Sequence, residues 1–558
     1  MEATSDIQRL SSGGWPSAAG YTPLVPMPSR VLLIGWDGAD WRILDPLLER
    51  GLLPNLAALI ARGGRATLTS TIPTHSWAAW PSFLTGVDPD GHGVYDILEG
   101  RGGTRQFPVT YRSIKERTFL QDLSDAGVES LVVNVPLTFP PPAIKGKLVA
   151  GGVLPKWRAF THPEGLADDL RKAGVPWPIN GMSWTTYRNR PVPFLEEVVE
   201  VTSARQRAME HLLDTTGWRV ACLVYFSTDR IQHCLAKYVS PDHPNYTALS
   251  KDRVAGRVRD VYRMLDDGLG RLLSRTGPDD LVIFMSDHGF QSVTRALNID
   301  RLLEHPGFLE FSASNKVFGP MQWGPVRTVA RKVYDRLGLH GRVSLPQPVD
   351  WAHTRAYTSV RSTGEGVSMN LAGREPGGIV DPADFEQVRQ EVAERVGSFV
   401  DPETGRSPVA RVWRREEAFK GPHAEGAPDL LLQPAPLYSL THAKKAVAPA
   451  DWISGDHRLD GVFAAAGPEV DRSVFPPAFR LVDLAPTLLA AMGVETSVHH
   501  SGVVLVPVVG DGTAGAIGEA RIRRGEAHGP LTRGESAGLD ESEVEEVEEH
   551  LRGLGYLE

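Results

Sequence analysis

Four short apolar runs constrain the fold of this chain more than any other feature of its sequence. They are Val31–Trp36, Leu131–Val135, Val220–Phe226 and Leu281–Met285. Uninterrupted runs of β-forming apolar residues are typical of strands buried on both faces of a parallel sheet. Segments with helical periodicity, from Phe194 to Asp214 and from Leu249 to Ser274, precede the last two runs. This β-α-β alternation predicts an α/β fold, with a mostly parallel central sheet between two layers of helices.

The ends of the chain and two internal stretches lack this pattern. We expect residues 1–28 to form a flexible arm and residues 29–509 to form one large domain, with insertions at about 156–193 and 292–413 that form a cap. Apolar runs at Leu430–Leu432 and Gly461–Ala466 predict where the central sheet resumes. Residues 510–558 are rich in glycine and then acidic, which predicts a linker followed by a solvated helix.

The composition argues against several classes of protein. A formal net charge of −9 is unsuited to a nucleic-acid-binding surface. The sequence has no apolar segment of the length that a signal peptide or a membrane span needs, so we expect a cytoplasmic protein without membrane association. Its two cysteines, Cys222 and Cys234, can form neither a disulfide framework nor a cysteine-rich zinc site. Any bound metal must therefore be held by histidines and carboxylates.

Acids and histidines follow three of the predicted strands, in GWDGAD, YFSTDRIQH and FMSDHG, and another histidine precedes a strand in GDHRLDGVFAAAG. Singly, each has an ordinary alternative role, because such an Asp usually caps a helix or forms a turn and such a His usually lies in a hydrogen-bonded loop. Together they are the ligand types that divalent metals require. Two ions a few Å apart would fit and would clamp a phosphoryl group.

Ser76 opens a predicted helix in the segment SWAAWPSFLTG, which follows Pro73 and ends at Gly86. A helix N-terminus favours an anion, so a hydroxyl at this position next to metal ions could act as the nucleophile toward phosphorus. The alternative is a plain N-cap serine.

These motifs, in this order, resemble the alkaline phosphatase superfamily, and most closely its branch of type I phosphodiesterases and nucleotide pyrophosphatases. The resemblance runs from about Ser29 to Pro507 and is supported by NVPLTFPP, LNIDRLL and the terminal LRGLGYLE. It implies an alkaline-phosphatase-like three-layer sandwich for residues 29–509, which would form the catalytic domain.

The resemblance also implies a role for each motif residue. One metal would be held by Asp229, His233 and His457, and a second by Asp37, Asp287 and His288. Ser76 would bridge toward the second metal and form a covalent phosphoserine intermediate that water then hydrolyses. Zinc is the usual ion, and manganese would suit the same ligands.

The chain departs from the family pattern at Ala79, where nucleotide pyrophosphatases commonly have an Asn that contacts the phosphate. Basic residues of the first insertion are candidate replacements for this contact, namely Lys156, Arg158, Arg188 and Arg190. The Cys/Ser-x-Pro-x-Arg motif of sulfatases does not fit the sequence around Ser76.

We therefore expect a metal-dependent hydrolase of phosphodiester or nucleotide pyrophosphate bonds, acting on a small-molecule phosphate ester or nucleotide. The alternatives are a phosphomonoesterase, a phosphonate hydrolase or a phosphotransferring mutase on the same site, or a metal-binding module without turnover.

Overall fold

The computed structural model describes most of the chain, from residue 27 to residue 554 with gaps. The described residues are 27–100, 102, 104, 106–155, 159–179, 181–187, 190–246, 252–304, 307–312, 349–441, 445–450, 453–495, 500–510 and 539–554. The arm expected at the N-terminus and the Gly-rich linker fall almost wholly outside these residues.

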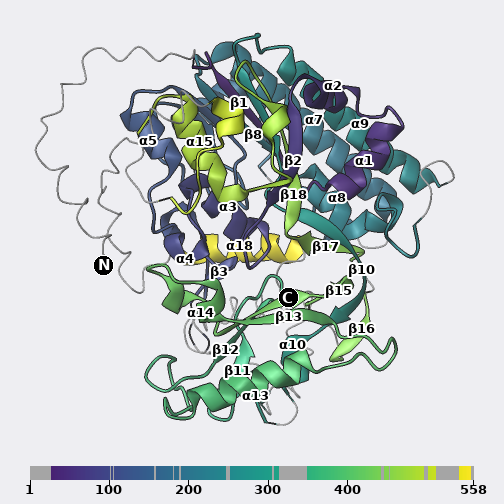
Figure 1. The fold of residues 1–558 in the computed structure, drawn as a ribbon, viewed down its shortest axis with the longest axis vertical. Helices are drawn as coiled ribbons and strands as arrows, with labels where there is room; N and C mark the ends of the chain where they lie inside the picture. Colours follow the sequence, from purple (N-terminus) through teal and green to yellow (C-terminus); the bar gives the residue numbers. More distant parts are fainter. Residues whose placement is uncertain are drawn as a thin grey trace, which may run out of the picture.

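A nine-stranded sheet forms the centre of the larger lobe (Figure 1). In spatial order its strands are β19 (Ala478–Arg480), β2 (Gly64–Thr69), β18 (Asp460–Ala466), β9 (Leu281–Met285), β1 (Val31–Trp36), β8 (Val220–Tyr225), β5 (Ser130–Val133), β6 (Gly146–Val149) and β7 (Thr161–His162). The five strands from β9 to β6 pair in parallel, whereas β18 runs antiparallel to both of its neighbours and β7 runs antiparallel to β6. The predicted mostly parallel sheet is thus confirmed.

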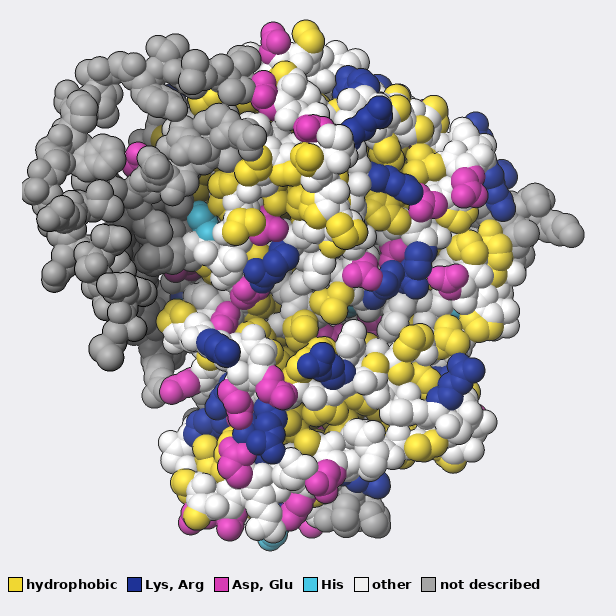
Figure 2. Space-filling model, in the orientation of Figure 1, with side chains coloured by type: hydrophobic (Ala, Val, Ile, Leu, Met, Phe, Trp, Pro, Cys, Tyr) yellow, Lys and Arg dark blue, Asp and Glu magenta, His cyan; other side chains and the backbone are white. Residues whose placement is uncertain are grey.

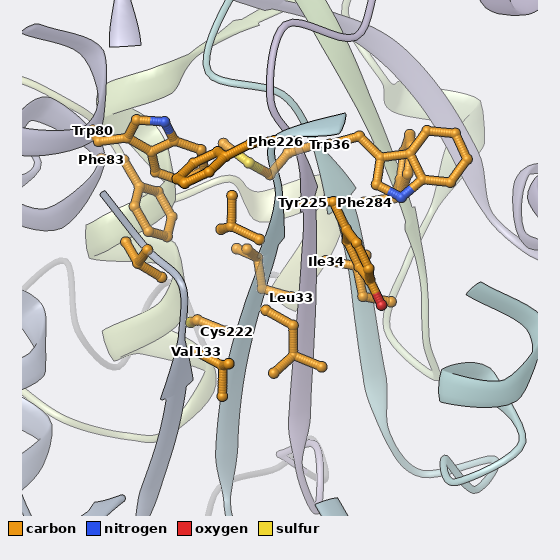
Figure 3. Packing of buried hydrophobic residues seen from close by; sticks show 14 of the residues in the cluster. Leu33, Ile34, Trp36, Trp80, Phe83, Val133, Cys222, Tyr225, Phe226 and Phe284 are labelled. Atoms are coloured by element: carbon orange, nitrogen blue, oxygen red, sulfur yellow. The ribbon is translucent and has the colours of Figure 1, made fainter. Parts of the chain in front are cut away.

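Helices cover both faces of this sheet, which gives three layers. One group comprises α1 (Trp41–Glu49), α2 (Pro54–Arg62), α7 (Pro191–Thr215), α8 (Ser227–Leu235) and α9 (Arg253–Leu273), and the other comprises α3 (Ser76–Thr85), α5 (Phe119–Asp125) and α15 (Leu484–Ala491). Strand β1 is completely buried between them, as its apolar sequence predicts. Figure 3 shows how large side chains fill this core, among them Trp36 and Phe284, whose ring centroids lie 5.0 Å apart.

The topology brings the candidate ligands to one edge of the sheet. Strands β1, β8 and β9 are parallel neighbours, so the residues that follow them emerge at the same edge. Strand β18 is antiparallel to β9, so its beginning lies at that edge too. Strand β17 (Gly455–Arg458), which directly precedes β18, places His457 there.

The second, smaller lobe lies below the central sheet in Figure 1, forms the lower part of the space-filling view in Figure 2, and has its own hydrophobic cluster. One of its sheets contains β10 (Gly289–Leu297), β15 (Leu437–Ser439), β16 (Val447–Pro449) and β17, and the other contains β11 (Ala356–Thr358), β12 (Gly366–Met369), β14 (Leu430–Pro434) and β13 (Val409–Arg414). Helices α10 (Ile299–Leu303) and α13 (Phe385–Gly397) complete this lobe.

The structure corrects two expectations about these regions. Leu430–Leu432 lies in the sheet of the smaller lobe, because a short apolar run looks alike in whichever sheet it is buried. Part of the first insertion also belongs to the main body, since β7 extends the central sheet and is followed by α6 (Leu166–Lys172) and the 3-10 turn η2 (Trp184–Tyr187). The remaining short elements include α4 (Pro89–His92), β3 (Leu98–Glu99), β4 (Phe107–Pro108), α14 (Arg415–Ala418) and α16 (Val506–Val509).

The acidic C-terminal helix α18 (Glu541–Gly553) packs on the larger lobe, contrary to the expectation of a solvated helix. Val544, Val547 and Leu551 are buried, and the hydroxyls of Ser183 and Thr185 both donate to the carbonyl of Gly553, each at 2.7 Å. These apolar residues recur at helical spacing among the acids, so one face of the helix is hydrophobic. Among the described residues, no helix combines the length and hydrophobicity that a membrane span requires.

Candidate metal centre

Asp37 leaves the end of β1 and is held in place by its neighbours. Its backbone N–H donates to the carbonyl of Tyr225 at 2.9 Å, and the indole N–H of Trp80 donates to its Oδ2 at 3.0 Å. The turn continues through Gly38, whose φ of +68° favours glycine and whose N–H donates to Oδ1 of Asp287 at 3.1 Å. The carboxylate is 2% exposed, so its position is fixed inside the protein.

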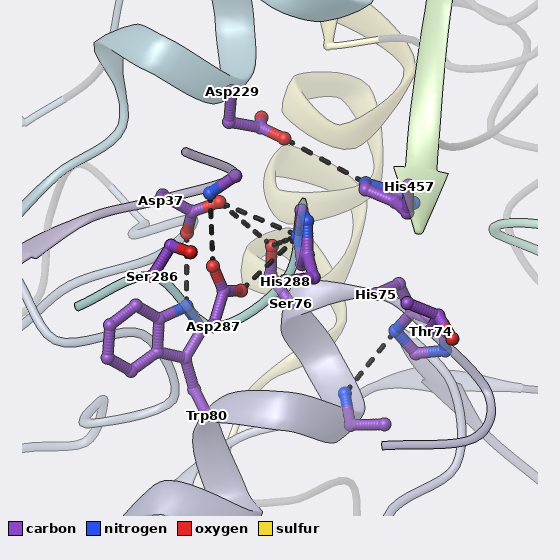
Figure 4. A network of polar contacts seen from close by, with 12 residues as sticks. Asp37, Thr74, His75, Ser76, Trp80, Asp229, Ser286, Asp287, His288 and His457 are labelled. Carbon is purple, nitrogen blue, oxygen red and sulfur yellow. Dashed lines mark hydrogen bonds and ion pairs between the residues drawn. The ribbon is translucent and has the colours of Figure 1, made fainter. Parts of the chain in front are cut away.

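Ser76 is the first residue of α3, as the sequence predicts, but it is not the residue that caps the helix. The cap is His75, whose ring accepts a hydrogen bond from the N–H of Ala78 at 3.3 Å. The Ser76 hydroxyl donates instead to Oδ1 of Asp37 at 3.2 Å, and Nε2 of His288 lies 3.1 Å from it. The hydroxyl therefore points to the acids and imidazoles at the edge of the sheet (Figure 4).

Asp229, His233 and His457 form one cluster of possible ligand atoms. Asp229 and His233 are one turn apart on α8, with Oδ1 and Nε2 3.3 Å apart. Nε2 of His457 lies 3.1 Å from Nε2 of His233 and 3.8 Å from Oδ1 of Asp229.

Asp37, Asp287 and His288 form a second cluster beside Ser76 (Figure 4). Nε2 of His288 lies 3.7 Å from Oδ1 of Asp37 and 3.3 Å from Oδ2 of Asp287. The two clusters adjoin, because the rings of His288 and His457 have centroids 4.3 Å apart. The structure thus brings all six candidate ligands together in two adjoining clusters, one of which contacts the Ser76 hydroxyl.

The donor set suits divalent cations. Oδ1 of Asp229 and Oδ2 of Asp287 are buried and make no well-formed hydrogen bond, although an imidazole nitrogen lies 3.3 Å from each, and a bound cation would offset the cost of burying these charges. Carboxylate oxygens and imidazole nitrogens without cysteine are ligands that zinc and manganese accept. Asp456, which the sequence interpretation missed, adds a carboxylate whose Oδ1 lies 3.3 Å from Nδ1 of His457. Carboxylates in this position commonly orient metal-binding imidazoles.

Buried negative charge dominates the second cluster. Burial, together with the charges of Asp287 and Asp229, raises the pKa of Asp37 well above its usual range. Burial and the charge of Asp229 also raise the pKa of Asp287 to about 7. Burial acts in the same direction on Asp229, but His233 and Arg230 outweigh it and lower the pKa of Asp229 to about 2. The second cluster therefore gains most from a bound cation.

Asp287→Asn is expected to stabilise the metal-free protein at pH 8 by a few degrees in melting temperature, and to have a smaller effect at pH 5, where only part of the ionisation cost is present. An acid whose pKa is 3.8 when unfolded and about 7 when folded binds its proton more tightly in the folded state, so ionisation costs stability as the pH rises between these values. Asn keeps the acceptor for the Gly38 N–H but carries no charge. Thermal melts in a chelator would measure this, and added metal should reverse the order of the two proteins. Equal melting temperatures of the wild type and the variant at pH 8 would show that the buried charge of Asp287 does not destabilise the metal-free protein.

A cavity opens beside the clusters and is lined by Asp37, Ser76 and Asp229 at one part of its wall. Of the basic residues expected to contact substrate, Lys156, Arg158 and Arg188 lie outside the described residues. Arg190 is exposed, stacks over the ring of Tyr187 at 5.5 Å and does not line the cavity.

Two other arginines line this cavity instead, Arg205 of α7 and Arg230 of α8. The sequence interpretation missed both, because each lies within a helix where charged residues are usually solvated. His550 and Leu554 of the C-terminal region also line the cavity, so the acidic helix α18 is part of the site.

Comparisons with known proteins found similarity to a protein family and to solved structures. A model of the type I phosphodiesterase / nucleotide pyrophosphatase family matches residues 31–460. Phosphonoacetate hydrolase from Sinorhizobium meliloti, solved with phosphonoformate, superposes with a TM-score of 0.51 and 16% identity over 82% of this chain and 95% of that chain. Murine ectonucleotide pyrophosphatase / phosphodiesterase 5 gives a TM-score of 0.47 and 14% identity over 85% of this chain and 97% of that chain. A search of curated proteins gave no match.

The likeness to the hydrolase structure supports the expected alkaline-phosphatase-like fold, and at such low identity it carries no more than that. The family match supports a stronger conclusion than the structural likeness. It spans well over half of the chain and includes the motifs around Asp37, Ser76, Asp229, Asp287 and His457. The chain therefore belongs to the type I phosphodiesterase/nucleotide pyrophosphatase family, whose members are enzymes that act on phosphoester bonds.

Proposed function

We propose that this protein is a metal-dependent hydrolase of phosphodiester or nucleotide pyrophosphate bonds that works through a phosphoserine at Ser76. The observation that carries the proposal is the position of the Ser76 hydroxyl, which lies within hydrogen-bond distance of both Asp37 and His288 at the edge of a cavity. A buried hydroxyl in contact with an acid and an imidazole is suited to nucleophilic attack.

Two divalent cations complete this proposal, one held by Asp229, His233 and His457 and the other by Asp37, Asp287 and His288. When bound, such a pair lowers the pKa of a coordinated hydroxyl or water and neutralises charge on the phosphoryl oxygens. Zinc is the expected ion and manganese is the alternative. The buried carboxylate oxygens of Asp229 and Asp287 that make no well-formed hydrogen bond support this part of the proposal.

The side chains then have distinct tasks in the reaction. The Ser76 oxygen attacks phosphorus, the bond from phosphorus to the leaving oxygen breaks, and the leaving group departs with that electron pair. Asp37 accepts the hydrogen bond of the attacking hydroxyl, would take its proton as the bond to phosphorus forms, and would pass that proton through solvent to the leaving oxygen. Water then attacks the phosphoserine, which restores Ser76 and releases the phosphate product. Trp80 fixes Asp37 throughout by donating its indole N–H.

A panel of aryl phosphates tests the proposal. We expect the chelator-treated protein, reloaded with Zn²⁺ or Mn²⁺, to hydrolyse bis-aryl phosphates with a kcat/KM at least ~10-fold above that for mono-aryl phosphates. A preference for monoesters would instead indicate a phosphomonoesterase, which the loss of the family Asn at Ala79 makes a serious alternative. Stoichiometric metal without turnover of either class would indicate a binding module.

A further inference from the structure

Arg205 is a buried cation whose hydrogen-bonding capacity is largely unused. It is only 6% exposed, and its Nη2 donates to the carbonyls of Pro178 at 3.2 Å and Ile179 at 3.4 Å. Its Nε and Nη1 are buried and have no hydrogen-bond partner. Burying charged donors without partners costs several kcal/mol, and a ligand that accepts hydrogen bonds from these donors would offset part of that cost.

Within the part of the chain that the structure describes, no carboxylate forms an ion pair with Arg205. Asp229 of this site pairs with Arg230 instead. Burial and the nearby charge of Arg230 lower the pKa of Arg205 to about 10, so Arg205 stays protonated at neutral pH. The rings of Trp177 and Phe226, 5.3 and 5.9 Å from the guanidinium carbon, give partial compensation.

Arg205 shares the cavity with Ser76 but contacts a different part of its wall. Its hydrogen bonds go to the segment before α7, and no hydrogen bond or ion pair joins it to any of the six candidate metal ligands. Arg230 lies between the two regions, because it lines the same cavity and its Nη1 is 3.6 Å from Oδ2 of Asp229. Arg205 and Ser76 thus line one cavity, while Arg205 makes no contact with the residues that would hold the metals.

The chemistry of this wall selects an anion. A guanidinium presents planar paired donors that match the oxygens of a phosphate or a carboxylate. The neighbouring lining is apolar, with Ile179, Met182 and Phe226, and a water-poor environment strengthens such charge-assisted hydrogen bonds.

We propose that Arg205, assisted by Arg230, binds a second anionic group of the substrate, a phosphate or a carboxylate adjacent to the reacting phosphoryl group. This inference rests on the proposed function and narrows it, because compounds with two adjacent anionic groups, such as diphosphates, become the preferred substrate class over diesters with uncharged leaving groups.

Equilibrium binding to metal-loaded Ser76→Ala protein tests this subsite without turnover. The probes are inorganic phosphate, inorganic pyrophosphate and phosphonoacetate, measured by calorimetry. We expect an additional Arg205→Gln substitution to weaken pyrophosphate or phosphonoacetate binding ~10- to 100-fold, as is typical of a lost charge-assisted hydrogen bond, and to change phosphate binding less than ~3-fold. A loss confined to pyrophosphate would identify the second group as phosphate, and a loss confined to phosphonoacetate would identify it as carboxylate.

Two further variants control for folding. Arg207→Gln removes an exposed arginine of the same helix and should leave all three affinities unchanged. Arg205→Lys keeps the charge and should weaken binding of the two-anion probes less than Arg205→Gln. Equal losses for phosphate and pyrophosphate would place Arg205 at the reacting group, and unchanged affinities would remove it from the binding site; either result overturns the inference. Turnover of aryl phosphates by the wild type reports separately on the proposed function.

Discussion

Ser76→Ala is expected to lower kcat/KM for aryl phosphate esters by at least ~10³-fold without unfolding the protein, which is the order of loss when a catalytic nucleophile is removed. The hydroxyl is the group that would form the covalent bond to phosphorus, and no other hydroxyl is recorded in contact with both Asp37 and His288 among the described residues. Alanine suits the first turn of a helix that is capped by His75, so the backbone should not change.

Ser82→Ala is the matched control, because Ser82 is a buried serine of the same helix whose hydroxyl lies 2.9 Å from His92. That variant should lose some stability but keep its turnover. Mass spectrometry of acid-quenched wild-type protein should detect phosphate on Ser76 during turnover of a bis-aryl phosphate. Undiminished activity in Ser76→Ala, or equal losses in both variants, would contradict the nucleophile assignment.

Sequence reasoning could place the metal candidates because they follow a rule of topology. Buried strands read as apolar runs, and the carboxyl ends of parallel strands meet at one edge, so Asp37, Asp229 and Asp287 were expected together. His457 is less obvious, because it precedes its central strand. It reaches the same edge only because β18 is antiparallel to β9, a direction that an apolar run does not reveal.

The substrate side of the cavity could not be predicted in this way. Arg205 and Arg230 lie on helices, and one helical position reads like another until the neighbouring elements are known. The buried face of α18 was likewise hidden by its acidic composition, although Val544, Val547 and Leu551 follow helical spacing. Ligands fixed by strand ends are thus accessible from sequence, whereas contacts made by packed helix faces require the tertiary structure.

Removing one histidine from each ligand cluster is expected to remove one metal ion at a time. Wild-type protein should bind two ions, while His457→Ala and His288→Ala should each retain about one and lose at least ~10³-fold in kcat/KM, because each ion contributes several kcal/mol of charge stabilisation. The two variants should differ in one respect. His288 also contacts the Ser76 hydroxyl, so His288→Ala should abolish phosphoserine formation. His457→Ala should slow phosphoserine formation without abolishing it.

Elemental analysis of the purified variants, combined with single-turnover kinetics, measures both effects. His243→Ala is the matched control, because His243 is also buried but its ring lies 3.2 Å from the carbonyl of Val293 and belongs to neither cluster. It should keep two ions and full turnover, so a loss of metal there would indicate a general effect of deleting a buried imidazole. Two retained ions with undiminished turnover in His457→Ala would exclude that residue as a ligand. The same result in His288→Ala would remove the second metal from the vicinity of Ser76, and with it the means by which the hydroxyl is activated.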